Sequence, residues 1–423
     1  MIKEPIIHRV IKIFVEIIVM FAVSGIIILI ADNHRPVMVS EDEKDNIDYS
    51  ELTIWYNNKD YEKYLDCLAK EYHREKGIKL NIKYVSDIYY FDSINKANNH
   101  TDDTYGSPPD VYMLSSEELE EAYGYGLASV NDSPLYNEEN YSKTSLKAIT
   151  YKGRYVAYPL AFDTAFMIYN ADYISAAPNS INDILMYEEN FNWEENPNIS
   201  HVLYFNISDI LHTYAFAGKY INIGGENGDD SSIFTVDNEN LSKSLSCYNS
   251  LSGRLRMNLE EDFKELPNAF MEGKIIYSII DMKEFSEIRN MGNVREIKYN
   301  ICEIPPFNEE IDTKSLSYTQ VMVVNYMSDK EDMAKELAEY ASYYRTDLIY
   351  SNTGMLPARH IDYVDSFNET IQQQYDNSCI LPKFRVTKDY YLQMQSLLNG
   401  AWKGNNIEEM IKNISETYKI RLQ

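Results

Sequence analysis

Residues 155–170 read YVAYPLAFDTAFMIYN, and this stretch decides the fold. It begins as a strand, carries Pro159 and Asp163 in its middle, and resumes as an apolar run that ends in Tyr-Asn. A proline removes a backbone donor from a strand ladder and favours extended geometry in the residue before it. We therefore expect two strands, Tyr155–Tyr158 and Ala165–Tyr169, joined by a crossover, rather than one continuous strand.

Strands and helices alternate on both sides of this stretch. ELTIWY at 51–56 alternates as a strand, residues 59–76 carry apolar residues at helical spacing, Gly77 ends that helix, and 79–85 alternates again. A strand–helix–strand unit of this kind predicts a parallel sheet. The alternation continues with strands expected at 108–114, 202–206, 297–307 and 318–326, helices at 117–123, 207–217, 328–344 and from 388 to the C-terminus, and a helix followed by a strand in 264–281. The fold class is therefore α/β, and 423 residues favour two domains.

The N-terminal segment has the pattern of a membrane anchor. Basic residues between Lys3 and Lys12 precede an apolar run from Ile13 to Ala31, close to the roughly 20 residues that a spanning helix needs. The positive-inside rule places everything after this run outside the cytoplasm. We expect residues 1–31 to form an uncleaved anchor and the acidic residues 32–49 to form a tether. A cleaved signal peptide and a buried core helix are the alternatives.

Composition argues for a binding protein. The formal net charge of -27 repels phosphate backbones, so no nucleic-acid partner is expected. The four cysteines lie far apart without metal-type spacing, and no nucleophile, zinc-protease or phosphate-loop motif occurs, so we expect no cofactor, metal or catalytic residue. The 37 tyrosines suit stacking against polar ligands, although most will be ordinary core or surface residues.

The chain resembles bacterial extracellular solute-binding proteins of ABC importers, in the group typified by maltose-binding protein. Six segments carry the resemblance in the family's order over roughly residues 50–415: LTIWYNN with EKGIKLNIKYV, SPPDVYMLSSEELEEAYGYGLASVND, ITYKGRYVAYPLAFDTAFMIYNADYI, NAFMEGKIIYSIID, SNTGMLPARHIDYVD and GAWKGNNIEEMIKNI. The resemblance implies two α/β lobes with a ligand cleft between them that closes about a hinge. It implies a first lobe of 50–160 plus 303–355 and a second lobe of 163–300 plus 360–423.

The resemblance also implies a set of ligand-binding positions. By this resemblance the cleft is lined by Trp55, Tyr56, Asn57, Asn58, Ser115, Glu117, Phe162, Asp163, Asp209, His212, Asp281, Tyr390 and Tyr391, and the hinge is formed by Pro159, Leu160, Ala161 and Thr164. A core tryptophan, a helix-start glutamate and a solvated turn acid are the plain alternatives for Trp55, Glu117 and Asp163. The chain has Asp281 where the family often has a tryptophan, which weakens a maltodextrin assignment, and it lacks the lipobox cysteine.

The expected function is capture of a small solute, a carbohydrate by resemblance, and its delivery to the permease subunits of an ABC importer. The expected protein is a monomer attached to the outer face of the membrane by its N-terminal helix. A membrane-tethered ligand sensor of the same fold and an extracytoplasmic enzyme acting on glycosides are the alternative functions.

Overall fold

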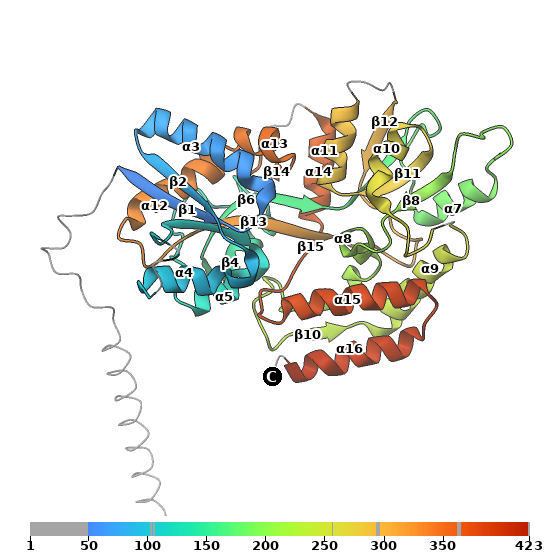
Figure 1. Ribbon diagram of the computed structural model, residues 1–423. Helices are drawn as coiled ribbons and strands as arrows, with labels where there is room; N and C mark the ends of the chain where they lie inside the picture. Colours follow the sequence, from blue (N-terminus) through green and yellow to red (C-terminus); the bar gives the residue numbers. More distant parts are fainter. Residues whose placement is uncertain are drawn as a thin grey trace, which may run out of the picture. The chain divides into compact units, whose positions relative to one another are not determined.

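The chain leaves one β-sheet and enters a second within the stretch 158–170. In the computed structural model, β6 (Tyr158–Thr164) belongs to a seven-stranded sheet, and β7 (Phe166–Asn170) to a four-stranded sheet. Figure 1 shows the first sheet around the β1, β2 and β13 labels and the second around β8, β11 and β12. The second strand lies close to the expected Ala165–Tyr169, but the first spans Tyr158–Thr164 instead of the expected Tyr155–Tyr158. Only Ala165 separates them, which makes the crossover far shorter than predicted.

The predicted role of Pro159 as a strand end is wrong. Pro159 lies inside β6 and pairs with Val321, at a register shift between Gln320 and Val321. An irregular point in a ladder tolerates a residue without an N–H, so the strand continues through the proline. The crossover predicted at Leu160–Thr164 is wrong as well, because the strand continues past the proline and includes these residues.

The structure describes residues 50–101, 104, 106–255, 257–292, 297–361 and 365–421, and this part of the chain forms one compact unit. The predicted anchor at 1–31 and tether at 32–49 lie outside the described residues. None of the helices in the described part is long and apolar enough to cross a membrane.

The seven-stranded sheet has the order β14-β6-β13-β3-β1-β2, with β15 paired to β13. Its strands other than β6 are β1 (Glu51–Tyr56), β2 (Lys79–Tyr84), β3 (Val111–Ser115), β13 (Leu316–Val324), β14 (Leu356–Pro357) and β15 (Cys379–Ile380). β1 runs parallel to β2 and β3, as the strand–helix–strand pattern predicted, whereas β13 runs antiparallel to β3 and β6.

The four-stranded sheet has the order β12-β7-β11-β8, and its strands beside β7 are β8 (His201–Phe205), β11 (Ile275–Ile280) and β12 (Tyr299–Cys302). Two short ladders lie apart from both sheets: β4 (Thr150–Tyr151) with β5 (Arg154–Tyr155), and β9 (Ile221–Ile223) with β10 (Phe234–Val236). The α/β class and the two-lobed fold expected from the sequence are confirmed.

Helices follow most of these strands (Figure 1). They are α3 (Glu62–Lys76), α4 (Tyr90–Asn98), α5 (Leu119–Gly124), α6 (Lys143–Ile149), α7 (Ile181–Glu189), α8 (Ile210–Thr213), α9 (Asn238–Ser252), α10 (Leu266–Met271), α11 (Met282–Met291), α12 (Glu331–Glu339), α13 (Asp347–Thr353), α14 (Ser366–Asp376), α15 (Thr387–Trp402) and α16 (Ile407–Arg421). Gly77 ends α3 with a φ of 74°, a left-handed conformation that a glycine adopts without strain.

The buried apolar side chains gather separately around the two sheets. One cluster draws on 52–161 and 321–349, and the others draw on 162–316 and 356–418. Ile304, Phe307 and Ile311 belong to the second group, although the first lobe was predicted to begin again at 303. After β12 the chain continues to pack against the second sheet until β13 begins. The first lobe therefore begins again later in the chain than the predicted residue 303. The lobe boundaries themselves stay a prediction.

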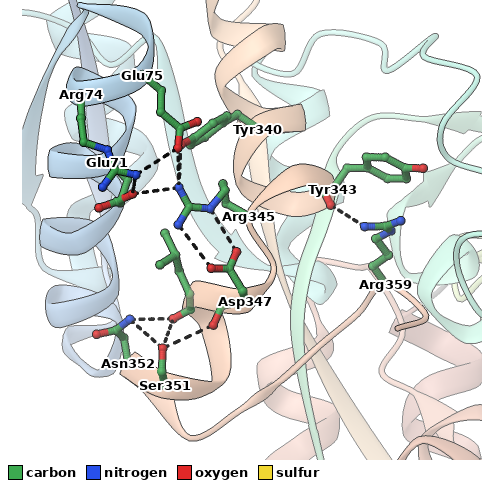
Figure 2. A network of polar contacts seen from close by, with 11 residues as sticks. Glu71, Arg74, Glu75, Tyr340, Tyr343, Arg345, Asp347, Ser351, Asn352 and Arg359 are labelled. Carbon is green, nitrogen blue, oxygen red and sulfur yellow. Dashed lines mark hydrogen bonds and ion pairs between the residues drawn. The ribbon is translucent and has the colours of Figure 1, made fainter. Parts of the chain in front are cut away.

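A polar network around Arg345 fastens α3 to the segment between α12 and α13 (Figure 2). The Arg345 guanidinium donates to Glu71 and Glu75 at 3.0 Å each and to Asp347 at 3.1 Å. It also donates to the Tyr340 hydroxyl at 3.0 Å. The Asp347 carboxylate and the further acceptors raise the pKa of Arg345 above its usual value. The planar guanidinium fork lets one side chain hold acceptors from several elements.

Candidate cleft between the two sheets

A cavity of about 690 Å³ lies where β1 and β3 end. Asn57 and Asn58 follow β1 directly, Ser115 is the last residue of β3, and Glu117 comes two residues later. β1 and β3 are parallel neighbours, so their carboxyl ends open at the same edge of the sheet, a common place for ligands in α/β folds. Tyr391, near the start of α15, lines the same cavity from the other part of the chain.

A second cavity of about 270 Å³ adjoins the first, since Asn58, Ser115, Tyr318 and Gln320 line both. It extends to side chains from the crossover and from the start of α11: Phe162, Asp163, Asp281 and Lys283, with Asp60, Tyr61, Ala161 and Met355. We call the two cavities together the cleft. Polar and aromatic side chains from the first sheet, from the start of α11 and from α15 face it, which is the usual make-up of a small-molecule site.

Local hydrogen bonds fix the side chains at the end of β3. The Ser115 backbone N–H donates to the Glu118 carboxylate at 3.3 Å, a bond typical of a helix start. The Ser115 hydroxyl donates to the Glu117 carboxylate, which holds that acid at the cavity wall. On the neighbouring loop, the Asn58 side-chain oxygen accepts from the Asp60 backbone N–H at 3.0 Å. These contacts limit the rotamers of the groups that would meet a ligand.

Acidic groups concentrate around the smaller cavity. The Asp163 carboxylate accepts from the Met282 backbone N–H at 3.0 Å. Burial and the nearby Asp281 carboxylate raise the pKa of Asp163 well above its ordinary value. Burial and the Glu284 carboxylate raise the pKa of Asp281 to about 6. Both acids are therefore held in surroundings that disfavour their charged forms.

His212 lies behind these acids and is 1% exposed. Its Nε2 is 3.3 Å from a Glu284 oxygen and 4.0 Å from an Asp281 oxygen. Burial acts to lower the pKa of His212, but the two carboxylates outweigh it and raise that pKa to about 9. The donor atoms of His212, Asp281 and Glu284 all lie within 4.8 Å of one another, so these three side chains could hold a metal ion.

The structure brings together eight of the thirteen ligand-binding residues expected from the resemblance. Asn57, Asn58, Ser115, Glu117 and Tyr391 line the larger cavity, and Phe162, Asp163 and Asp281 line the smaller one together with Asn58 and Ser115. Phe162 also stacks on Tyr375, with ring centroids 3.9 Å apart. Whether these residues touch a ligand stays a prediction.

The other five expected residues line neither cavity. Trp55 is fully buried in the core and Tyr56 is 4% exposed, because both are residues of the central strand β1. Tyr390 is buried, and its hydroxyl lies 2.8 Å from that of Tyr214. Asp209 caps α8 by accepting from the Leu211 backbone N–H, and His212 faces Asp281 and Glu284 instead of the cavity.

The expected hinge residues lie in β6. Pro159, Leu160, Ala161 and Thr164 are all buried strand residues, and the Thr164 hydroxyl donates to the Leu316 carbonyl of β13 at 2.8 Å. β6 and β13 are paired up to the point where β6 ends, at Thr164 opposite Ser317. A hinge role for these residues stays a prediction.

Sequence reasoning missed Tyr318 and Gln320, which line both cavities. The sequence held a signal for both residues. Residues 318–326 were expected to form a strand, and residues two apart on a strand point to the same face, so Tyr318 and Gln320 share one face. It also missed the second wall of the larger cavity, formed by Leu381, Phe384, Arg385, Thr387, Lys388 and Leu392, together with Lys59, Glu118 and Glu121. No motif marks that wall, since it is brought to the cleft by the packing of α15.

No protein-family model matches the chain. A maltooligosaccharide ABC transporter solute-binding lipoprotein of Streptococcus pneumoniae is 23% identical over 193 residues, which is 45% of this chain and 44% of that protein. The match thus spans less than half the length of this relative.

Among solved structures, the extracellular solute-binding protein from Staphylococcus aureus in complex with maltose matches with a TM-score of 0.73 at 15% identity, over 89% of this chain and 99% of that one. A cyclo/maltodextrin-binding protein complexed with maltotetraose matches with a TM-score of 0.72 at 14% identity, over 89% and 98% of the two chains. These likenesses establish the fold of the described chain as that of two-lobed solute-binding proteins.

Proposed function

We propose that this protein is the extracytoplasmic solute-binding component of an ABC importer and that it captures a carbohydrate. The observation that supports the proposal most directly is the position of the cleft. It lies between two sheets that are joined through the single residue Ala165, and it is lined by hydroxyl, amide, acidic and aromatic side chains from both sides. Hydroxyl-rich solutes need this mixture of hydrogen-bonding groups and flat aromatic faces.

The relatives named above bind maltose, maltotetraose or maltooligosaccharides according to their descriptions, and this chain is proposed to bind a solute of the same broad class. In this proposal the lobes close about the β6–β7 crossover and the paired strand β13, and the closed form is recognised by permease subunits. The protein acts as a monomer without catalysis, held at the outer face of the membrane by its N-terminal segment.

Thermal unfolding of the full chain in detergent tests the proposal, because a ligand that binds only the folded state raises Tm. The panel contains maltotriose, maltotetraose, other oligosaccharides, amino acids, polyamines and phosphate. We expect an oligosaccharide to raise Tm and to reduce the radius of gyration in small-angle X-ray scattering. A Tm that none of the oligosaccharides changes would overturn the carbohydrate assignment.

A matched pair of variants localises the binding. Tyr391→Ala removes an aromatic face from the larger cavity and should abolish most of the Tm shift. Tyr344→Ala makes the same substitution at a side chain that is 60% exposed and lines neither cavity, so its ligand-induced shift should equal that of the parent protein. A full ligand-induced shift in Tyr391→Ala would place the binding outside the larger cavity.

A further inference from the structure

The smaller cavity has an excess of acidic over basic side chains. Asp60, Asp163 and Asp281 line it, against one basic residue, Lys283. The Lys283 ammonium lies 3.9 Å from the Asp60 carboxylate, at the more exposed rim. Behind the cavity, protonated His212 lies nearest to Glu284, so its positive charge pairs mainly with the Glu284 carboxylate. Asp163 and Asp281 therefore share one half-buried region without a matching number of cations among the described residues that surround it.

A buried amide in the same cavity points to a ligand independently of this charge. Gln320 is 9% exposed, and its Nε2 has no acceptor among the described residues. It lies opposite Ser115 on one neighbouring strand and Ala161 on the other, and it lines both cavities. A buried donor without an acceptor is destabilising, so its presence in a native structure calls for an explanation, and an acceptor on a bound ligand is one.

We infer that the captured solute is an amino sugar or an oligosaccharide containing one, and that its ammonium group binds between Asp163 and Asp281 while Gln320 Nε2 donates to a neighbouring hydroxyl oxygen. The inference rests on the proposed carbohydrate-binding function and narrows its ligand class. An ammonium group supplies the positive charge that the smaller cavity lacks, and adjacent ring hydroxyls supply the acceptor that Gln320 lacks.

Isothermal titration of the chelator-dialysed full chain tests the inference with two cationic probes, a chitosan trisaccharide and kanamycin. Two neutral probes, N-acetylated chitotriose and maltotriose, complete the panel. We expect at least one cationic probe to bind about tenfold or more tightly than either neutral probe at pH 6.5, because an ammonium paired with buried carboxylates is worth at least that much.

Three variants make the assignment specific. Asp163→Asn should remove the preference for cationic probes. Gln320→Ala should weaken the same probe while leaving the preference for cationic probes in place. Asp132→Asn makes the same charge change at a side chain that is 81% exposed and lines neither cavity, so it should leave affinity and preference unchanged.

Each other outcome overturns the inference. If maltotriose binds as tightly as the cationic probes, the carbohydrate-binding proposal stands and the amino-sugar inference fails. If none of the four probes binds, both fail. If Zn²⁺ binds to the parent protein but not to His212→Ala, and the cationic probes do not bind, the missing cation is a metal ion held by His212, Asp281 and Glu284.

Discussion

The Asp163 carboxylate accepts a hydrogen bond from the Met282 backbone N–H at 3.0 Å, which joins the end of β6 to the start of α11. The next-to-last residue of this strand of the first sheet thus bonds to the helix that follows β11 of the second sheet. The same carboxylate faces the smaller cavity. Because Asp163 both bonds to α11 and lines the cleft, a ligand that contacts its carboxylate can alter the geometry of the β6–β7 crossover.

Replacing Asp163 by asparagine should stabilise the empty protein at neutral and alkaline pH. Asparagine keeps an oxygen for the Met282 N–H but carries no charge. The raised pKa of Asp163 means that this residue contributes stability when protonated and loses it as pH rises through that raised value. Urea unfolding at pH 5 and pH 8 should show an advantage of Asp163→Asn that grows with pH. A variant less stable than the parent at pH 8 would contradict this account.

Replacing His212 by glutamine should destabilise the protein mainly below pH 9. The pKa of His212 rises from its ordinary value near 6.5 to about 9 in the folded state. Its stabilising contribution is therefore full below the unfolded value and is lost as pH rises through about 9. The difference in unfolding free energy between the parent and His212→Gln should shrink between pH 6 and pH 10. Glu284→Gln removes the nearest partner and should flatten the same pH dependence; a constant difference would exclude the ion pair.

Replacing Trp55 by phenylalanine should affect folding and leave binding intact. The Trp55 ring is fully buried in β1, with the Lys83 ammonium 4.4 Å from its centroid. We expect the unfolding free energy to fall by about 1–3 kcal/mol through lost packing. The Kd of any sugar that binds should change by less than about twofold, since the ring does not face the cleft. A large loss of affinity at unchanged stability would show that Trp55 does contact the ligand.

Replacing Arg345 by lysine should loosen the attachment of α3. A single ammonium cannot reach the three carboxylates that the guanidinium bonds in Figure 2. We expect a loss of about 1–2 kcal/mol in unfolding free energy, smaller at high salt because the acids are partly exposed. Arg74→Lys is the matched control, since Arg74 is 66% exposed and its ion pairs within the described chain are to Glu71 and Glu75 of its own helix; its loss should stay below about 0.5 kcal/mol.

How much of the site could be predicted from the sequence depended on where each residue stands in its element. Asn57, Asn58, Ser115 and Glu117 follow strands whose pattern was plain, and residues just past the carboxyl ends of parallel strands face one edge. Trp55 and Tyr56 stand only one or two residues earlier, yet they lie in the ladder and point into the core. A shift of one position along a strand reverses the face of a side chain, and resemblance alone could not settle that register.

Tyr390 and Tyr391 show the same limit on a helix. Neighbouring residues on a helix point about 100° apart, so the packing of α15 buries Tyr390 against Tyr214 and turns Tyr391 to the cleft. The basic residues Arg385 and Lys388 reach the cavity by that same packing, across more than 260 residues of chain from Glu117 and Glu118.

The sequence by itself determined the α/β class and the parallel β1–β2 unit, because these depend on local periodicity. The passage of residues 155–170 from one lobe to the other was expected from the family resemblance. Only the tertiary structure decided that Pro159 stays within β6, since its pairing with Val321 at an irregular register is a contact between distant segments. It also decided which acids share the smaller cavity. Their raised pKa values arise from burial and from one another's charge, and both depend on neighbours that no local pattern encodes.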